Sequence, residues 1–248
     1  MRARALLALA LTLAGSVAAQ EPGAREILDR AETLLWGNTL HGVFEMTITT
    51  PRWQRTLEMR AWMDRPRRSF MRVLAPAKEK GIGSLRIGAE MWNYLPNVER
   101  TIKIPPSMML QPWMGSDFTN DDIVKASSVL DDYTQRIVRE EPMGGAPAYA
   151  LELVPKPDAA VVWGKILYWV RKGDFIPLKE EFYSERGELV RTMTFSEVRP
   201  MGGRTIPTRW EIRPSGKPGN LTTMLMRSAV YDRSIDPEIF TQRNLQRP

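Results

Sequence analysis

The feature that most constrains the fold of this chain is an alternation of apolar and polar residues that recurs along most of its length. In residues 44–48 and 57–63 every second residue is apolar, and the residues between are mostly polar. Successive side chains of a β-strand point to opposite faces of a sheet, so each segment predicts a strand with one buried face. The apolar members are Phe44, Met46, Ile48, Leu57, Met59, Ala61 and Met63.

Further segments have the length and composition of strands, and glycine, proline or charged turns separate them. They are residues 69–74, 83–87, 91–95, 100–104, 133–139, 148–154, 165–171, 178–183, 189–198, 204–213 and 221–230. About eleven or more strands with few helices predict a mainly β fold, either a strongly curved antiparallel sheet or a barrel. Because the chain has no linker, repeat or low-complexity tract, we expect residues 20–248 to form a single domain.

Three segments depart from the strand pattern. Apolar residues recur at helical spacing between Pro22 and Gly37, which predicts an amphipathic helix with one apolar face. Residues 119–124 begin with polar and acidic residues and predict the start of a short helix. Residues 155–164 mix loop residues with apolar ones. The two later segments are candidates for flaps over one end of the sheet.

The N-terminus predicts export. Arg2 and Arg4 precede an apolar run and then small residues, which is the pattern of a secretory signal peptide over residues 1–19. The apolar run is too short to cross a membrane, and no later segment reaches that length. Without cysteine there is no lipid-acceptor thiol, so we expect a released, soluble mature chain. Loss of the two arginines lowers the formal net charge from +6 to +4, which makes nucleic acid a less attractive partner.

The composition argues against an enzyme or a metal protein. The chain has no cysteine, and His41 is its only histidine, so thiolate nucleophiles and the usual zinc ligands are missing. Acidic residues occur in adjacent pairs, as at positions 180 and 181. Adjacent residues on a strand point to opposite faces, so such a pair does not place two carboxylates in one cleft. We therefore predict no catalytic residue, no metal and no cofactor.

Residues 91–118 combine an aromatic strand with an apolar, methionine-rich loop. Contiguous exposed apolar surface usually marks a site for a lipid, a ligand or a partner, and methionine suits contacts that change. The alternative is an ordinary buried loop. Trp92 and Tyr94 share one face of their strand and either line a cavity or pack against the N-terminal helix. The same two alternatives apply to Tyr168 and Met193.

Several short segments, taken together in order and spacing, resemble the LolA/LolB-like family of exported lipoprotein carriers. The resemblance is to a longer branch of outer-membrane lipoprotein-sorting proteins and extends over most of the mature chain. The segments are KGIGSLR at 80–86, MWNYLP at 91–96, MGSDF at 114–118, PLKEEFY at 177–183 and IPTRW at 206–210.

The resemblance implies an incomplete, strongly curved β-barrel whose N-terminal helix and helical or loop lid close over an apolar cavity for acyl chains. It also implies a periplasmic carrier that moves a lipoprotein or lipid from an inner-membrane exporter to an outer-membrane acceptor. The alternative is a sensor of lipid or lipoprotein on the same half-barrel that binds a membrane-protein partner. Candidate cavity and lid residues are Phe44, Met46, Ile48, Leu57, Met59, Met63, Trp92, Tyr94, Met108, Met109, Leu110, Trp113, Met114 and Phe118.

A basic turn follows the second predicted strand. Arg65, Arg67, Arg68 and Arg72 are close together in the sequence and are candidates for contact with phosphate head groups or an acidic partner. The alternative is a solvated hairpin end.

Overall fold

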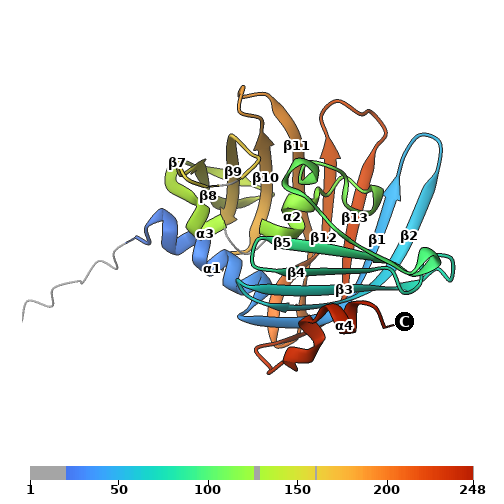
Figure 1. The fold of residues 1–248 in the computed structure, drawn as a ribbon. Helices are drawn as coiled ribbons and strands as arrows, with labels where there is room; N and C mark the ends of the chain where they lie inside the picture. The colour runs from blue at the N-terminus through green and yellow to red at the C-terminus, as the bar shows by residue number, and fades with distance from the viewer. Residues whose placement is uncertain (1–20, 126–128, 160, 248) are drawn as a thin grey trace, which may run out of the picture.

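The computed structural model describes residues 21–125, 129–159 and 161–247, and the strands within them form one thirteen-stranded antiparallel sheet (Figure 1). The predicted signal peptide lies outside the described residues. The strands are β1 (Thr39–Thr49), β2 (Gln54–Asp64), β3 (Arg68–Ala75), β4 (Gly83–Ile87), β5 (Glu90–Leu95), β6 (Arg100–Lys103), β7 (Tyr133–Met143), β8 (Ala146–Pro155), β9 (Lys165–Arg171), β10 (Pro177–Tyr183), β11 (Leu189–Met201), β12 (Arg204–Pro214) and β13 (Leu221–Tyr231).

The sheet consists of two meanders that are joined through the first and the last strand. In space the order is β6-β5-β4-β3-β2-β1-β13-β12-β11-β10-β9-β8-β7. Strands that follow each other in the chain pair with each other, except β6 and β7, and β1 pairs in addition with β13. β6 and β7 are the two edges, so the described sheet is not closed, and Figure 1 shows that it is strongly curved. The predicted mainly β fold with an incomplete barrel is confirmed.

Short helices occupy the ends and the middle of the chain. The α-helices are α1 (Ala24–Trp36), α2 (Asn120–Lys125), α3 (Val129–Asp132) and α4 (Gln242–Leu245), and the 3-10 helices are η1 (Pro96–Val98), η2 (Pro106–Met108), η3 (Trp113–Gly115) and η4 (Pro237–Phe240). Both helices expected from the sequence, before Gly37 and after residue 119, are present. Within the described residues, no helix is long and apolar enough to span a membrane.

α1 is helical because one face of it is apolar and a glycine ends it. Ile27 and Leu28 are fully buried, and α1 contacts β7, β9 and β12. Gly37 adopts a positive φ of 62°, which side chains disfavour, and its N–H donates to the Thr33 carbonyl at 2.9 Å. A Cβ at this position would lie 2.9 Å from Asp232 Oδ1. The chain therefore turns directly from α1 into β1.

The sheet has apolar clusters on both faces. We call the face toward α1 the inner face and the opposite face the outer face. On the inner face one cluster is centred on β1, β2, β12 and β13, and a second lies where α1 meets β7 to β10. A third cluster covers the outer face of β3, β4 and β5 beneath η4 and α4. Two non-strand segments, residues 105–125 (the central segment) and residues 235–247 (the C-terminal segment), contribute to these clusters.

Candidate functional site

A cavity of about 170 Å³ lies between α1, the central segment and the inner face of the sheet. An engineered apolar cavity of about 150 Å³ holds a benzene molecule, so this cavity has room for a group of that size. Its apolar lining residues are Leu28, Leu35, Trp36, Phe44, Met59, Ala61, Met63, Met71, Trp113, Phe118, Ile123, Val129, Leu153, Trp163, Ile166, Phe182, Met193, Phe195, Trp210 and Met224. Five of them are methionines, whose flexible thioether chains fit surfaces that change shape.

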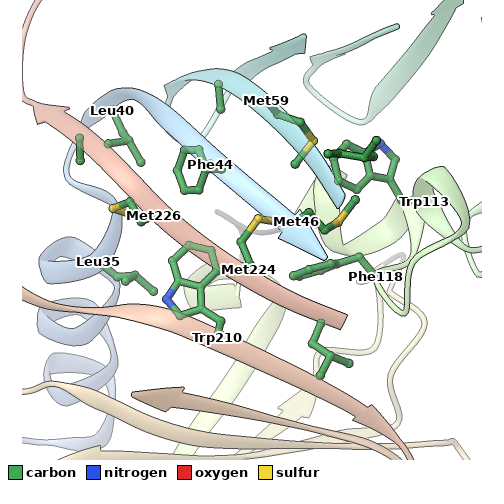
Figure 2. Packing of buried hydrophobic residues seen from close by; sticks show 14 of the residues in the cluster. Leu35, Leu40, Phe44, Met46, Met59, Trp113, Phe118, Trp210, Met224 and Met226 are labelled. Carbon is green, nitrogen blue, oxygen red and sulfur yellow. The ribbon is translucent and has the colours of Figure 1, made fainter. Parts of the chain in front are cut away.

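The central segment forms one wall of this cavity. Figure 2 shows Trp113 and Phe118 of this segment approaching Met59 and Met46 on the sheet, while Trp210 lies farther along the same apolar layer. Trp113 is 1% exposed, and its indole N–H donates to Ser84 Oγ at 3.1 Å. The segment is therefore anchored by one large aromatic side chain whose polar atom has a partner inside the protein.

Five of the residues predicted from the sequence line the cavity: Phe44, Met59, Met63, Trp113 and Phe118. Their contact with a ligand stays a prediction. Tyr168 and Met193, for which the sequence left cavity lining and core packing open, also line it.

Met46, Ile48 and Leu57 lie on the predicted face but belong to solid core. They are almost fully buried in the same cluster as Phe44, yet they do not line the cavity. Alternation along a strand identifies the face on which a side chain lies. It does not say whether another side chain or a cavity lies opposite.

The expectation that Trp92 and Tyr94 line the cavity or contact the N-terminal helix is wrong. Both pack on the outer face of β5, in the cluster that contains Phe240 and Leu245. The opposite face of the strand, which includes Met91, belongs to the inner core. Only the folded chain brings the C-terminal segment to this aromatic pair.

The methionine-rich part of the central segment is divided between solvent and core. Met108 and Leu110 are exposed, at 42% and 57%. Met109 and Met114 are partly buried against the inner core. Since none of these four predicted lid residues lines the cavity, the predicted residues of the central segment that do so are Trp113 and Phe118.

Most arginines of the basic turn after β2 are engaged with the protein, and their contact with a head group or an acidic partner stays a prediction. Arg68 pairs with Asp64, and Arg72 donates to the carbonyl oxygens of Asn244 and Leu245. Arg67 alone among these arginines is exposed, and its role stays a prediction.

Arg65 of this turn points inward and lines the cavity. Its guanidinium lies 3.7 Å from a carboxylate oxygen of Glu32 on α1 and also donates to the carbonyl oxygens of Glu32 and Gly37. Tyr168 donates to the other Glu32 oxygen at 3.3 Å. Burial raises the pKa of Glu32 to about 7, although Arg65 and the Tyr168 hydroxyl act in the opposite direction. The cavity thus has a polar patch around Glu32 of α1.

Other charged groups of the cavity wall come from distant parts of the sequence and were not predicted. They are Arg86, Asp121, Asp122, Glu180 and Arg191. One signal was available for Glu180, because alternation along β10 places it on the same face as the apolar Phe182. The pairing of the other groups depends on tertiary contacts.

Residues 65–247 match a family model whose description reads only as an uncharacterized protein, and no curated protein matches the sequence. The chain belongs to the family that this model describes, and its fold is that of LolA-like proteins. Three crystal structures have the same fold and cover 90% of this chain. A LolA superfamily protein from Nitrosomonas europaea is 24% identical, with a TM-score of 0.78 and 99% of its own length covered.

The other two relatives are equally similar in fold. A domain from Vibrio parahaemolyticus assigned to outer membrane lipoprotein-sorting proteins is 22% identical, with a TM-score of 0.78 and 98% of its length covered. A DUF1329 family protein from Desulfovibrio piger is 22% identical, with a TM-score of 0.81 and 97% of its length covered.

In this LolA-like chain a buried ion pair attaches the central segment to the sheet. The Arg191 guanidinium on β11 donates to both carboxylate oxygens of Asp122, each at 2.5 Å, and to the Asp117 carbonyl oxygen at 3.0 Å. It also lies over the rings of Phe182 and Trp163, at 4.1 and 4.6 Å. A bidentate pair of this kind fixes orientation as well as position. Arg191 therefore holds the start of α2 over the cavity.

Proposed function

We propose that this protein is a periplasmic carrier that binds the acyl chains of a lipoprotein or lipid in its cavity. The cargo would pass from an inner-membrane exporter to an outer-membrane acceptor. The observation that supports the proposal is an apolar cavity closed by a non-strand segment. The fold is shared with a domain assigned to outer membrane lipoprotein sorting, and the N-terminal sequence predicts export.

Binding in such a site needs few directional bonds. Each buried methylene contributes about 0.8 kcal/mol, so burying part of two or three chains gives ample affinity. A cavity of about 170 Å³ accepts only a short part of an acyl chain. We expect the central segment to move outward on loading, and Phe44, Met59, Met63, Trp113 and Phe118 to contact the chain.

The contacts of the central segment suit such a movement. The buried apolar side chains Trp113 and Phe118 of this segment border the cavity, while Met108 and Leu110 are already exposed. When the segment moves outward, the apolar contacts that it loses are replaced by contacts with the acyl chain. Release needs the reverse exchange, so an empty protein that closes on itself helps an acceptor to compete for the cargo.

Transfer of a fluorescent diacylated lipopeptide between two vesicle populations tests the proposal. With the carrier present, we expect the transfer rate to rise in proportion to protein concentration. Mass spectrometry of a denaturing extract of the protein purified from its native compartment should also find acylated species. A transfer rate equal to that without protein, together with an extract free of acyl chains, would contradict the carrier function.

A cavity-filling variant links transfer to this site. Ala61 is 2% exposed and lines the cavity, so Ala61→Phe should occupy the space and abolish transfer. Ile102→Phe on exposed β6 is the matched control, because it adds the same ring away from the cavity and should transfer normally. Denaturant unfolding of both variants shows that they are folded. Normal transfer by folded Ala61→Phe would locate the cargo elsewhere.

A further inference from the structure

Glu180 is a carboxyl group of the cavity wall that the described part of the fold leaves without a polar partner. It lies on the inner face of β10, where its register partners are Tyr168 on β9 and Met193 on β11. Among the residues that the structure describes, none forms a hydrogen bond or ion pair with its side chain. Its strand neighbours Lys179 and Glu181 point to the other face and pair with each other at 2.5 Å.

The cations of the cavity are engaged with other groups. Both terminal nitrogens of Arg191 donate hydrogen bonds to Asp122, and Arg65 pairs with Glu32. Arg86 donates to Ser69 and to the carbonyl oxygens of Gly88 and Pro66. The arrangement therefore leaves Glu180 facing an apolar space without a counter-ion of its own.

The electrostatics of this position follow from the same geometry. Burial, and next the nearby charge of Glu32, hold the pKa of Glu180 well above its usual range, and Arg191 opposes them. A carboxyl group that faces an apolar space without a hydrogen-bond partner is unfavourable. An ammonium group beside it would lower its pKa and pair with the ionised form, whereas an anionic head group would raise its pKa further. A donor brought in by a ligand would satisfy the group.

We propose that Glu180 forms a polar subsite of the cavity that selects amphiphiles whose head group donates a hydrogen bond, an ammonium or a hydroxyl, over those with an anionic head group. The subsite rests on the proposed function, since it assumes that an alkyl chain occupies the apolar part of the cavity. Tyr168 and Glu32 border it, so the head group would lie next to Glu32 of α1.

Three amphiphiles with the same twelve-carbon chain test the subsite: dodecylamine, dodecanol and dodecanoate. Their dissociation constants are measured at pH 7 by calorimetry on the mature chain, below their aggregation concentrations. We expect dodecylamine to bind most tightly and dodecanoate least tightly, about tenfold or more apart, because hydrogen bonds to charged groups are the strong ones. Dodecanol should lie between them.

Glu180→Gln should reduce the difference between dodecylamine and dodecanoate to less than about threefold. Glu181→Gln is the matched control, because it makes the same change one residue away on the opposite face, where Glu181 pairs with Lys179 and accepts from Tyr183. It should keep the wild-type order. If Glu180→Gln does not fold, the wild-type order of the three compounds still tests the proposal.

The outcomes separate the two proposals. Dodecanoate binding as tightly as dodecylamine, or an unchanged preference in folded Glu180→Gln, would overturn the subsite and leave the carrier function standing. Failure of all three compounds to bind would overturn the carrier function itself.

Discussion

The central segment and the C-terminal segment both cover an apolar patch of the same sheet, on opposite faces, but they do so differently. The C-terminal segment closes a solid cluster in which Phe240 and Leu245 are 3% and 0% exposed. The central segment closes a cavity and exposes Met108 and Leu110. Similar lengths of chain thus make one fixed cover and one cover with space beneath it.

Most polar contacts of the C-terminal segment lie within the segment, and its hydrogen bonds to the sheet involve Arg72 and Thr101. The Thr241 hydroxyl accepts from the Asn244 N–H at the start of α4, and Arg72 donates to the last carbonyl oxygens of that helix. These bonds complete the helix ends, and the Arg72 bonds together with apolar packing hold the segment on the sheet. The apolar side chains fill the space beneath, so separating this segment from the sheet exposes them without replacement.

The central segment depends more on long-range polar contacts. Asp122 and Asp117 bond to Arg191 and Thr222 on the sheet, and Arg55 donates to the Met114 carbonyl oxygen. A cover held by a few such bonds can open at a definite place when the space beneath is filled by a ligand. The comparison therefore suggests which cover is structural and which one can move.

The largest expected effect on stability comes from a substitution in the C-terminal segment. Phe240→Ala should lower the free energy of unfolding by about 4 kcal/mol, because it removes a large side chain from a filled cluster. Lipopeptide transfer should be unchanged while the protein is folded. Leu110→Ala on the central segment is the control, and at 57% exposure it should change stability by less than about 0.5 kcal/mol. Equal effects of the two changes would break the comparison.

Asp122→Ala should come next, with a loss of about 3 kcal/mol, because it leaves the buried Arg191 charge unpaired. Combining it with Arg191→Met should recover much of that loss, which a double-mutant cycle measures. If the ion pair holds the cover closed, Asp122→Ala should also take up dodecylamine faster in stopped-flow fluorescence. An unchanged uptake rate would mean that the pair stabilises the fold without controlling access.

The smallest expected effect is on the pH dependence of the free energy of unfolding, and it involves Glu32 in the cavity wall. The folded-state pKa of Glu32, about 7, lies above its ordinary value of 4.5. The stability associated with the protonated group is therefore present below pH 4.5 and is lost as the pH rises through 7. Between pH 5 and 7 the wild type should lose about 2 kcal/mol more than Glu32→Gln does.

Denaturant unfolding at several pH values measures this difference. Phe240→Ala should keep the pH slope of the wild type, because the outer cluster is separate from Glu32. A wild type and a Glu32→Gln variant with parallel pH profiles would show that Glu32 titrates normally in the folded protein.

Much of the fold could be predicted from the sequence because strand alternation is a local property. Residues 83–87 and 165–171 were predicted as strands with the bounds that β4 and β9 have in the structure. α1 likewise followed from helical spacing and a terminal glycine. Prediction of the site was less complete, and Trp92 and Tyr94 show why. Their shared face was correct, but the segment that covers them is about 145 residues away in the chain.

The sequence by itself determined the strands, the first helix, the buried face of β1 and β2, and the resemblance to LolA-like proteins. These depend on side chains two to four residues apart and on short motifs. Only the tertiary structure decided that the inner face encloses a cavity near Trp113, that the outer face carries a second apolar cluster, and that Glu32, Arg65 and Glu180 meet at one wall. The physical reason is that covering segments and buried charges find their partners across the sheet, at distances in sequence that no local pattern records.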